Sequence, residues 1–146
     1  MNEPERVYSA RFVIVGCGRL GSILASELSQ AGSRVVIIDR DRKSFSLLDA
    51  RFSGFQLAGD AVEVDVLRSA NVAEADCFLT TTEKDTVNLM VAQVAKVVFS
   101  VPLVLARVYD PKRESLYRKF GIETICPTSL TGQEFLRVIR QGSVPS

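Results

Sequence analysis

Apolar residues fall along the chain in short continuous runs that alternate with segments of helical periodicity. Residues 12–15 are all apolar, which is typical of a parallel strand that is covered on both faces. The next segment places Leu20, Leu24 and Leu28 at helical spacing, and Gly32 provides a natural end for a helix. This alternation continues along the chain, so strands and helices are expected to follow one another throughout.

The pattern predicts strands at residues 11–15, 35–38, 54–58, 77–81, 103–107 and 122–125. It predicts helices at residues 20–31, 41–51, 62–70, 83–99, 112–120 and 131–140. Such alternation with short connections favours an α/β fold, a doubly wound parallel sheet of strand order 3-2-1-4-5-6 with a C-terminal helix. A ligand is expected beyond the carboxyl ends of the strands, where the strand order reverses between the first and the fourth.

The longest predicted helix, residues 83–99, should bury one apolar stripe. That stripe holds Val87, Met90, Val91, Val94 and Val98, and the polar residues Asn88, Gln93 and Lys96 fall outside it. Residues 86–106 form a nearly apolar window, but Lys96 and Pro102 interrupt it. The window therefore favours a helix followed by a strand over a membrane span.

Three glycines, Gly16, Gly18 and Gly21, spell G-x-G-x-x-G between the first strand and the first helix. The first glycine permits a tight turn, the second lets a pyrophosphate approach the backbone, and the third lets the helix pack close to the sheet. The free N–H groups and the positive end of the helix dipole favour an anion. A phosphate is therefore expected at this turn.

Asp39 ends the second strand, where a carboxylate can accept hydrogen bonds from ribose hydroxyls. A carboxylate there also repels a 2′-phosphate, which favours an NAD-like or ADP-like ligand over NADP. Arg40 and Arg42 follow directly and weaken that exclusion.

Further candidate ligand contacts are Cys17, Arg19 and Leu20 in the turn, Arg40 after the second strand, Asp60 and Ala61 after the third, Thr80, Thr81 and Thr82 after the fourth, and Arg107 at the end of the fifth. Structural roles are open alternatives for most of them. Asp60 can cap the following helix, and the threonines can cap the long helix. Arg107 can pair with Asp110 instead of a phosphate. Arg19 can be a surface cation, and Cys17, which the helix terminus could acidify, can simply be a small residue that fits.

Composition narrows the chemistry. The net charge is +1 with scattered Lys and Arg, so nucleic-acid binding is not expected. There is no His, which excludes a Ser-His-Asp site and removes a usual zinc ligand, and no metal site is expected. The three cysteines lack a CxxC pattern, which fits a reducing compartment. No Tyr is followed four residues later by Lys, as a short-chain reductase needs, so binding is expected and hydride chemistry is not.

Five segments together resemble a known family: "GCGRLGSILASELSQAGSRVVIIDRD", "LAGDA", "TTEKDTVNLMVAQVAK", "VPLVLARVYDP" and "FGIETICPT". They resemble the N-terminal domain of the regulators of potassium conductance (RCK), also called the TrkA-N or KTN domain. The resemblance implies a Rossmann-like fold and a cytoplasmic, non-enzymatic regulatory subunit that binds an adenine nucleotide, either NAD(H) or ATP, ADP or AMP. The alternative is a small NAD-dependent oxidoreductase, or another Rossmann enzyme, whose partner supplies the substrate site.

The resemblance also implies partners. Family members form dimers that assemble into rings such as octamers, with copies of themselves or a longer related subunit, and dock on a membrane potassium channel or transporter at its inner face. Residues 131–140 would be the crossover helix that leans on a neighbouring subunit, or else a helix folded back on its own domain. Residues 1–9 are expected to be a tail, and residues 10–146 one domain without the C-terminal lobe of most members. Thr128 stands where some members carry an acid that helps place a metal, so metal-assisted ATP binding is not implied.

Overall fold

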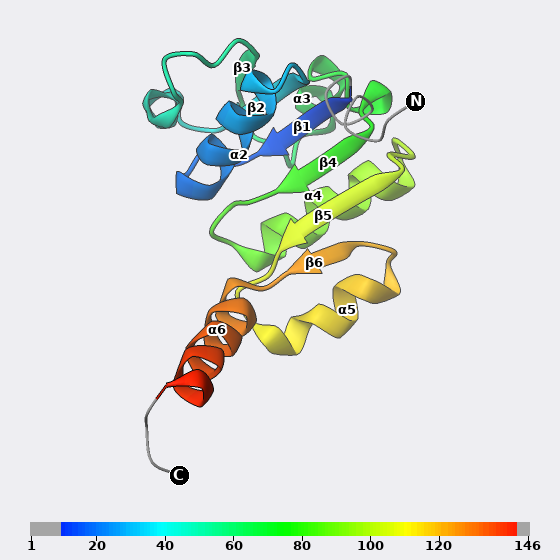
Figure 1. Cartoon of the computed structure of the whole chain (residues 1–146). Coiled ribbons are helices and arrows are strands. Elements are labelled where there is room, and N and C mark those ends of the chain that lie inside the picture. Colours follow the sequence, from blue (N-terminus) through cyan, green and yellow to red (C-terminus); the bar gives the residue numbers. More distant parts are fainter. Residues whose placement is uncertain (1–9, 143–146) are drawn as a thin grey trace, which may run out of the picture.

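The computed structural model describes residues 10–142 and shows a six-stranded sheet with helices on both faces (Figure 1). Its strands are β1 (Arg11–Val15), β2 (Arg34–Asp39), β3 (Phe55–Ala58), β4 (Cys77–Thr80), β5 (Leu103–Arg107) and β6 (Glu123–Ile125). Neighbouring strands are parallel and follow the order β3-β2-β1-β4-β5-β6. The predicted fold class and strand order are therefore confirmed.

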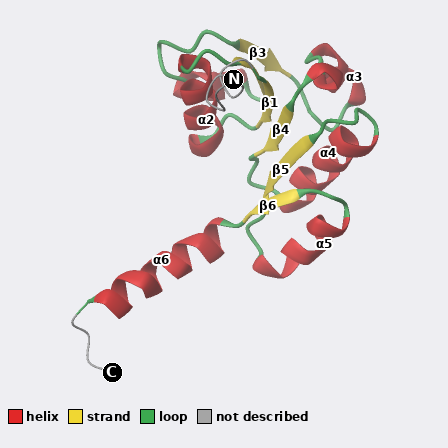
Figure 2. Ribbon diagram, turned by 45° about the vertical axis from the view of Figure 1, so that its right-hand side comes forward, coloured by secondary structure: helices red, strands yellow, loops and turns green. Residues whose placement is uncertain are grey.

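The helices divide between the two faces of the sheet (Figure 2). They are α2 (Arg19–Gln30), α3 (Val64–Ser69), α4 (Asp85–Val97), α5 (Glu114–Lys119) and α6 (Pro127–Gln141), with 3₁₀ turns η1 (Arg42–Leu47), η2 (Val72–Glu74) and η3 (Pro111–Arg113). On one face α2 packs on β1 and β2 around Ile14 and Ile37, and on the other α4 packs on β4 and β5 around Phe78 and Val104. The two cores hold the carboxyl ends of β1 and β4 side by side.

The predicted helix at residues 41–51 is wrong, because only the 3₁₀ turn η1 forms there. The Asp41 side chain accepts a hydrogen bond from the Lys43 amide, and the Ser46 hydroxyl donates to the Lys43 carbonyl. Short polar side chains that bond their own backbone compete with α-helix formation. The predicted helix at 112–120 likewise divides, into η3 and α5.

The starts of α3 and α6 differ from the prediction for identifiable reasons. α3 begins only at Val64, because the Asp60 side chain accepts from the Val62 amide and holds a turn ahead of the helix. The expectation that Asp60 caps the helix itself is therefore wrong, since Glu63 stands at that position. α6 begins earlier than predicted, at Pro127, because proline is well suited to the first helical position.

The predicted apolar stripe of α4 is partly wrong. Its buried residues are Asn88, Val91, Ala92 and Ala95, whereas Met90 is 46% exposed and lies on the opposite side. The two alanines let α4 approach the sheet closely, so the buried side of this helix carries smaller side chains than the predicted stripe. The buried amide of Asn88 requires hydrogen-bond partners, and they come from the site described below.

α6 projects from the edge of the sheet (Figures 1 and 2), and no residue of this helix is buried. The alternative in which the last helix folds back on its own domain is therefore wrong. Within residues 10–142 no helix has both the length and the hydropathy that crossing a bilayer requires.

Candidate functional site

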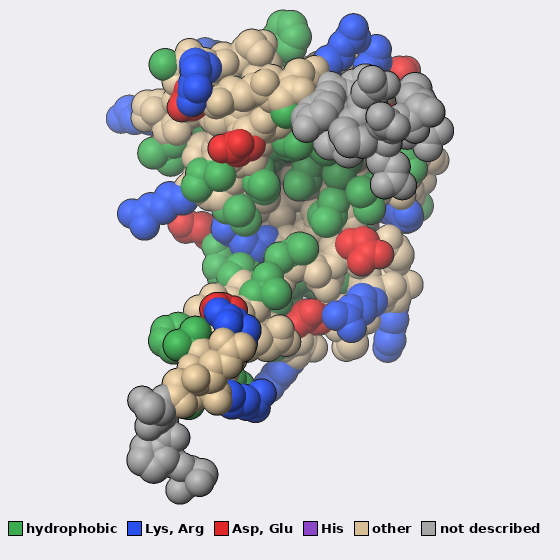
Figure 3. Space-filling model, in the orientation of Figure 1, with side chains coloured by type: hydrophobic (Ala, Val, Ile, Leu, Met, Phe, Trp, Pro, Cys, Tyr) green, Lys and Arg blue, Asp and Glu red, His purple; other side chains and the backbone are tan. Residues whose placement is uncertain are grey.

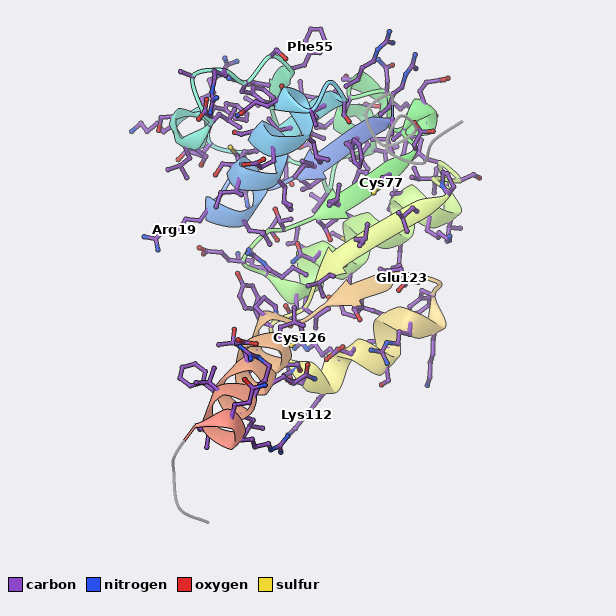
Figure 4. The ribbon with its side chains drawn as sticks, in the orientation of Figure 1. Arg19, Phe55, Cys77, Lys112, Glu123 and Cys126 are labelled. Atoms are coloured by element: carbon purple, nitrogen blue, oxygen red, sulfur yellow. The ribbon has the colours of Figure 1, made fainter. Side chains whose placement is uncertain are left out.

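A cavity of about 990 Å³ opens at the carboxyl ends of the strands. The structure gathers most of the predicted contacts in its lining: Gly16, Gly18, Arg19, Leu20, Asp39, Arg40, Asp60, Ala61, Thr81, Thr82 and Arg107. Cys17, Gly21 and Thr80 do not line the cavity and lie behind its wall. Arg19 extends outward from the N-terminal end of α2 (Figure 4), at the rim of the cavity.

The presence of glycine has a different structural explanation at each of the three positions. Gly16 has a φ of +104°, which favours glycine. A Cβ on Gly21 would lie 1.8 Å from the Gly16 carbonyl oxygen, so only glycine lets α2 pack against the turn. Gly18 has an ordinary φ of −85°, and a Cβ there would meet no atom of the described chain within 4 Å. Neither strain nor internal packing requires a glycine at position 18, whose missing side chain leaves space in the cavity.

The amides of the turn fall into two groups. The Gly16 amide donates to the Ile38 carbonyl at 2.8 Å, and the Cys17 amide donates to Asp39 Oδ2 at 2.8 Å, so both are already used within the protein. The first bond of α2 runs from the Ser22 amide to the Gly18 carbonyl at 2.9 Å. The amides of residues 18–21 come before that bond and have no partner within the helix. They are the donors that remain for a ligand.

The start of α2 carries no competing negative charge. In the described chain its first turn holds no acidic residue, and no side chain caps Gly18. The partial positive charge of the helix N-terminus is therefore open to an anion.

The Asp39 carboxylate is held by two main-chain donors. Oδ2 accepts from Cys17 and Oδ1 accepts from the Asp41 amide at 2.9 Å. Each oxygen can still accept from a ligand hydroxyl, because a carboxylate offers about four acceptor positions. Nearby, Arg40 Nε lies 3.8 Å from Asp60 Oδ2, so its charge is directed toward that acid.

The threonines after β4 tie the glycine turn to the sheet. The Thr81 hydroxyl lies 3.1 Å from the Val15 carbonyl oxygen and 2.9 Å from that of Gly16. The Thr80 hydroxyl donates to the main-chain carbonyl of Asn88. The alternative that these threonines cap α4 is wrong, since Lys84 is the N-cap residue and has no side-chain cap bond in the described chain.

Arg107 closes the far side of the cavity. Its Nη2 donates to the carbonyl oxygens of Thr81 and Thr82, and the guanidinium lies 4.7 Å from the centre of the Tyr109 ring. The predicted alternative of a pair with Asp110 is therefore wrong. Arg107 Nε is buried without a hydrogen-bond partner in the described chain, which leaves one donor of this cation unused beside the cavity.

Cys17 is a fully buried thiol whose Sγ lies 3.4 Å from the Ser44 carbonyl oxygen. Burial, with a smaller effect of the Asp39 charge, raises its pKa to about 11. The possibility that the helix terminus acidifies this thiol is therefore wrong, because the group stays protonated at neutral pH.

Several residues that line the cavity were not identified from the sequence: Ser44, Leu47, Val62, Glu83, Lys84, Val87 and Tyr109. Lys84 and Tyr109 each follow shortly after a strand, and this position in the sequence could have identified them as lining residues. The others lie on turns or helices whose bounds were predicted differently. Ser44 and Leu47, for example, belong to η1.

The family model of the TrkA-N domain matches residues 12–127. The chain belongs to the TrkA-N family. TrkA-N and RCK domains are non-enzymatic regulatory domains of potassium transport systems, which confirms both the predicted resemblance and the expectation of a protein that is not an enzyme. The Trk system potassium uptake protein TrkA of Streptomyces coelicolor is 40% identical over 134 residues, which cover 91% of this chain and 60% of that protein. This TrkA-N chain thus spans about three fifths of the length of that relative.

Solved structures share the fold at lower identity. The TrkA-N domain of the inner membrane protein ybaL from Escherichia coli has a TM-score of 0.80 at 17% identity, over 90% of this chain and 97% of that one. A Kef C-terminal domain from Shewanella denitrificans in its AMP-bound form has a TM-score of 0.72 at 20% identity, over 91% and 82%. GsuK structures bound to NAD and to ADP both have a TM-score of 0.68, at 16% and 17% identity, over 82% and 81% of this chain and 21% and 31% of theirs.

Proposed function

We propose that this TrkA-N chain binds an adenine nucleotide in the cavity at the carboxyl ends of the strands and thereby regulates a potassium channel or transporter. NAD(H) and ATP, ADP or AMP share the adenosine and phosphate groups that the cavity suits. The AMP, NAD and ADP complexes of proteins with the same fold support this choice of ligand.

The observation that carries the proposal is the space at Gly18. Gly16 and Gly21 are explained by backbone conformation and packing, but the missing side chain of Gly18 has no purpose within the protein itself. It leaves room for a group that comes close to the amides of residues 18–21. A phosphate fits that place, because those amides and the α2 dipole all favour an anion.

The remaining residues suit the rest of a nucleotide. Asp39 faces the cavity with acceptor positions for ribose hydroxyls, and the Asp60 and Ala61 side of the cavity is the place for adenine. Arg19 at the rim is the cation that a longer phosphate chain would reach, so it is the residue that distinguishes ligands by phosphate number.

The proposed regulation works through a second copy of this chain or a longer related subunit. On α6, Phe135, Leu136, Val138 and Ile139 are all exposed and share one side of the helix. The register of β5 and β6 places Leu103 and Ile125 on the sheet face opposite α4, where each is 45% exposed. Figure 3 shows hydrophobic side chains gathered on this face between α2 and α6. Exchange of α6 between two copies would cover both apolar surfaces.

Nucleotide binding can shift such an assembly only if one arrangement binds the ligand better than another. A tenfold preference corresponds to about 1.4 kcal/mol per site, so several coupled sites suffice for a switch. The assembly would then act on its membrane partner from the inner face.

The test replaces Gly18 with Ala. We expect Gly18→Ala to keep its free energy of unfolding within about 1 kcal/mol, since its φ suits alanine and its Cβ meets no atom. Its affinity for ADP, measured by calorimetric titration, should fall at least tenfold, because the Cβ occupies the space of the phosphate. Gly132→Ala on α6 is the matched control, since its Cβ also meets open space, and it should bind ADP like the wild type. Equal ADP affinity in Gly18→Ala and wild type would contradict the proposal.

A further inference from the structure

Asn88 is a fully buried polar residue with an exposed fraction of 0%, and it lies outside the cavity lining. Its side chain connects two segments that do line the cavity. Nδ2 donates to the Thr82 carbonyl at 2.9 Å and to the Arg107 carbonyl at 3.0 Å. Oδ1 accepts from the Thr82 amide at 3.0 Å and from the Thr82 hydroxyl at 2.6 Å. All hydrogen-bonding positions of this amide are used.

These bonds fix the peptide groups around Thr82 in one orientation. The Thr82 carbonyl that accepts from Asn88 also accepts from the guanidinium of Arg107, and so does the Thr81 carbonyl. The Thr81 hydroxyl in turn bonds the carbonyls of Val15 and Gly16. Asn88 therefore fixes one side of the loop after β4. The other side of this loop bonds the glycine turn and keeps it in place.

We infer that Asn88 is a positioning residue for the phosphate end of the proposed nucleotide site, acting through Thr82 and Arg107. The inference rests on the proposed function. Asn88 itself touches no ligand; it sets where the glycine turn and the Arg107 cation stand relative to each other. The adenosine end, at Asp39 and Asp60, has no bond to this amide.

Asn88→Asp tests the inference because it keeps the shape of the side chain and one acceptor oxygen. It removes both donations to the carbonyls and sets a carboxylate against them, so the loop must move. ADP affinity should fall at least tenfold, whereas adenosine affinity should change less than about threefold. A general loss of folding would lower both affinities together, so the ratio of the two is the readout. Gln93→Glu, the same amide-to-acid change on α4 away from the cavity, is the control and should leave the ratio unchanged.

Thr82→Val is the second variant, in case Asn88→Asp does not fold. It removes the hydroxyl that bonds Asn88 Oδ1 and that also accepts from the Lys84 amide at 3.3 Å, and it keeps both main-chain bonds of Thr82 to Asn88. It should show a smaller shift of the ADP to adenosine ratio in the same direction, and Thr82→Ser should restore the wild-type ratio. An unchanged ratio in the folded variants overturns the role of Asn88 and leaves the nucleotide site in place. A wild type that binds neither ADP nor adenosine overturns the proposed function, and this inference with it.

Discussion

Asp39 shows how one side chain can shape the glycine turn and still serve a ligand. Its two oxygens accept main-chain bonds from residues 17 and 41, so the carboxylate is oriented before any nucleotide arrives. The neighbouring cation, Arg40, lies 3.8 Å from Asp60, which draws its charge away from the place of a 2′-phosphate. If the ribose binds at Asp39 as proposed, this carboxylate would exclude 2′-phosphorylated ligands, and Arg40 would weaken that exclusion less than its position in the sequence indicates.

Replacing Asp39 should relax that exclusion. In Asp39→Asn we expect the preference for AMP over adenosine 2′,5′-bisphosphate to narrow about tenfold, because the like charge next to the 2′-phosphate is gone. Competition binding with a fluorescent adenylate measures both affinities. Asp65→Asn is the control, since Asp65 is a surface acid outside the cavity lining. An unaltered preference in Asp39→Asn would place the ribose elsewhere.

The buried thiols predict a loss of stability at alkaline pH. Burial raises the pKa of Cys17 and of Cys77 to about 11 from a usual value of 9.0. In the unfolded chain these groups ionise first, so their contribution to stability is fully present below pH 9 and is lost as the pH rises toward 11. The effect is about 1.4 kcal/mol per pKa unit for each thiol. The free energy of unfolding, measured with urea at pH 7, 9 and 10.5, should decline in this way. A Cys17→Ala, Cys77→Ala double variant should show a smaller decline. The same decline with pH in the double variant and the wild type would refute the explanation.

At the scale of elements, the apolar runs predicted the strands well, because a strand buried on both faces has a purely local signature. β1 and β5 have the predicted bounds, β2 is longer by one residue at each end, and the others differ by one residue at one end. The turn η1 was missed because the side chains of Asp41 and Ser46 bond nearby main-chain groups. The hydrophobic periodicity of the sequence does not reveal that competition.

The same limit applies to the site. The glycine motif and Asp39 could be found from the sequence because their spacing along the chain is what brings them together. Asn88 could not, since its partners are Thr82 on the loop after β4 and Arg107 at the end of β5, 6 and 19 residues away, and only the folded sheet brings them together. On a helical wheel it was simply a polar residue outside the apolar stripe.

The apolar side of α6 is exposed and is not covered by another part of the described chain. If it covers a second copy, Phe135→Arg should convert a dimer to a monomer without changing the unfolding midpoint of the domain, because Phe135 is 67% exposed and contributes little to the core. Sedimentation equilibrium gives the molecular mass directly. Gln133→Arg, on the polar side of the same helix, should leave the dimer intact. A monomeric wild type, or a dimeric Phe135→Arg, would contradict the role of α6.

In the whole molecule, the parallel sheet places the residues that line the cavity at the carboxyl ends of its strands. The exposed apolar residues of β5, β6 and α6 lie at one edge of the same sheet. β5 connects the two, because Arg107 at its end lines the cavity, and the carbonyl of Tyr109 in the following loop accepts from the hydroxyl of Thr128 in the first turn of α6. A nucleotide bound as proposed would lie beside Arg107, two residues along the chain from Tyr109, whose carbonyl bonds the first turn of α6. This short path is the physical basis for expecting the ligand to influence assembly.

The central claim is that the amides of residues 18–21 receive a phosphate. Titration of ¹⁵N-labelled protein with ADP, followed by amide chemical shifts, tests it most directly. We expect the largest shifts at Gly18, Arg19 and Leu20, with the Cys17 amide less affected because it already donates to Asp39. Saturable ADP binding that leaves these amides unshifted, or no binding at all, would contradict it.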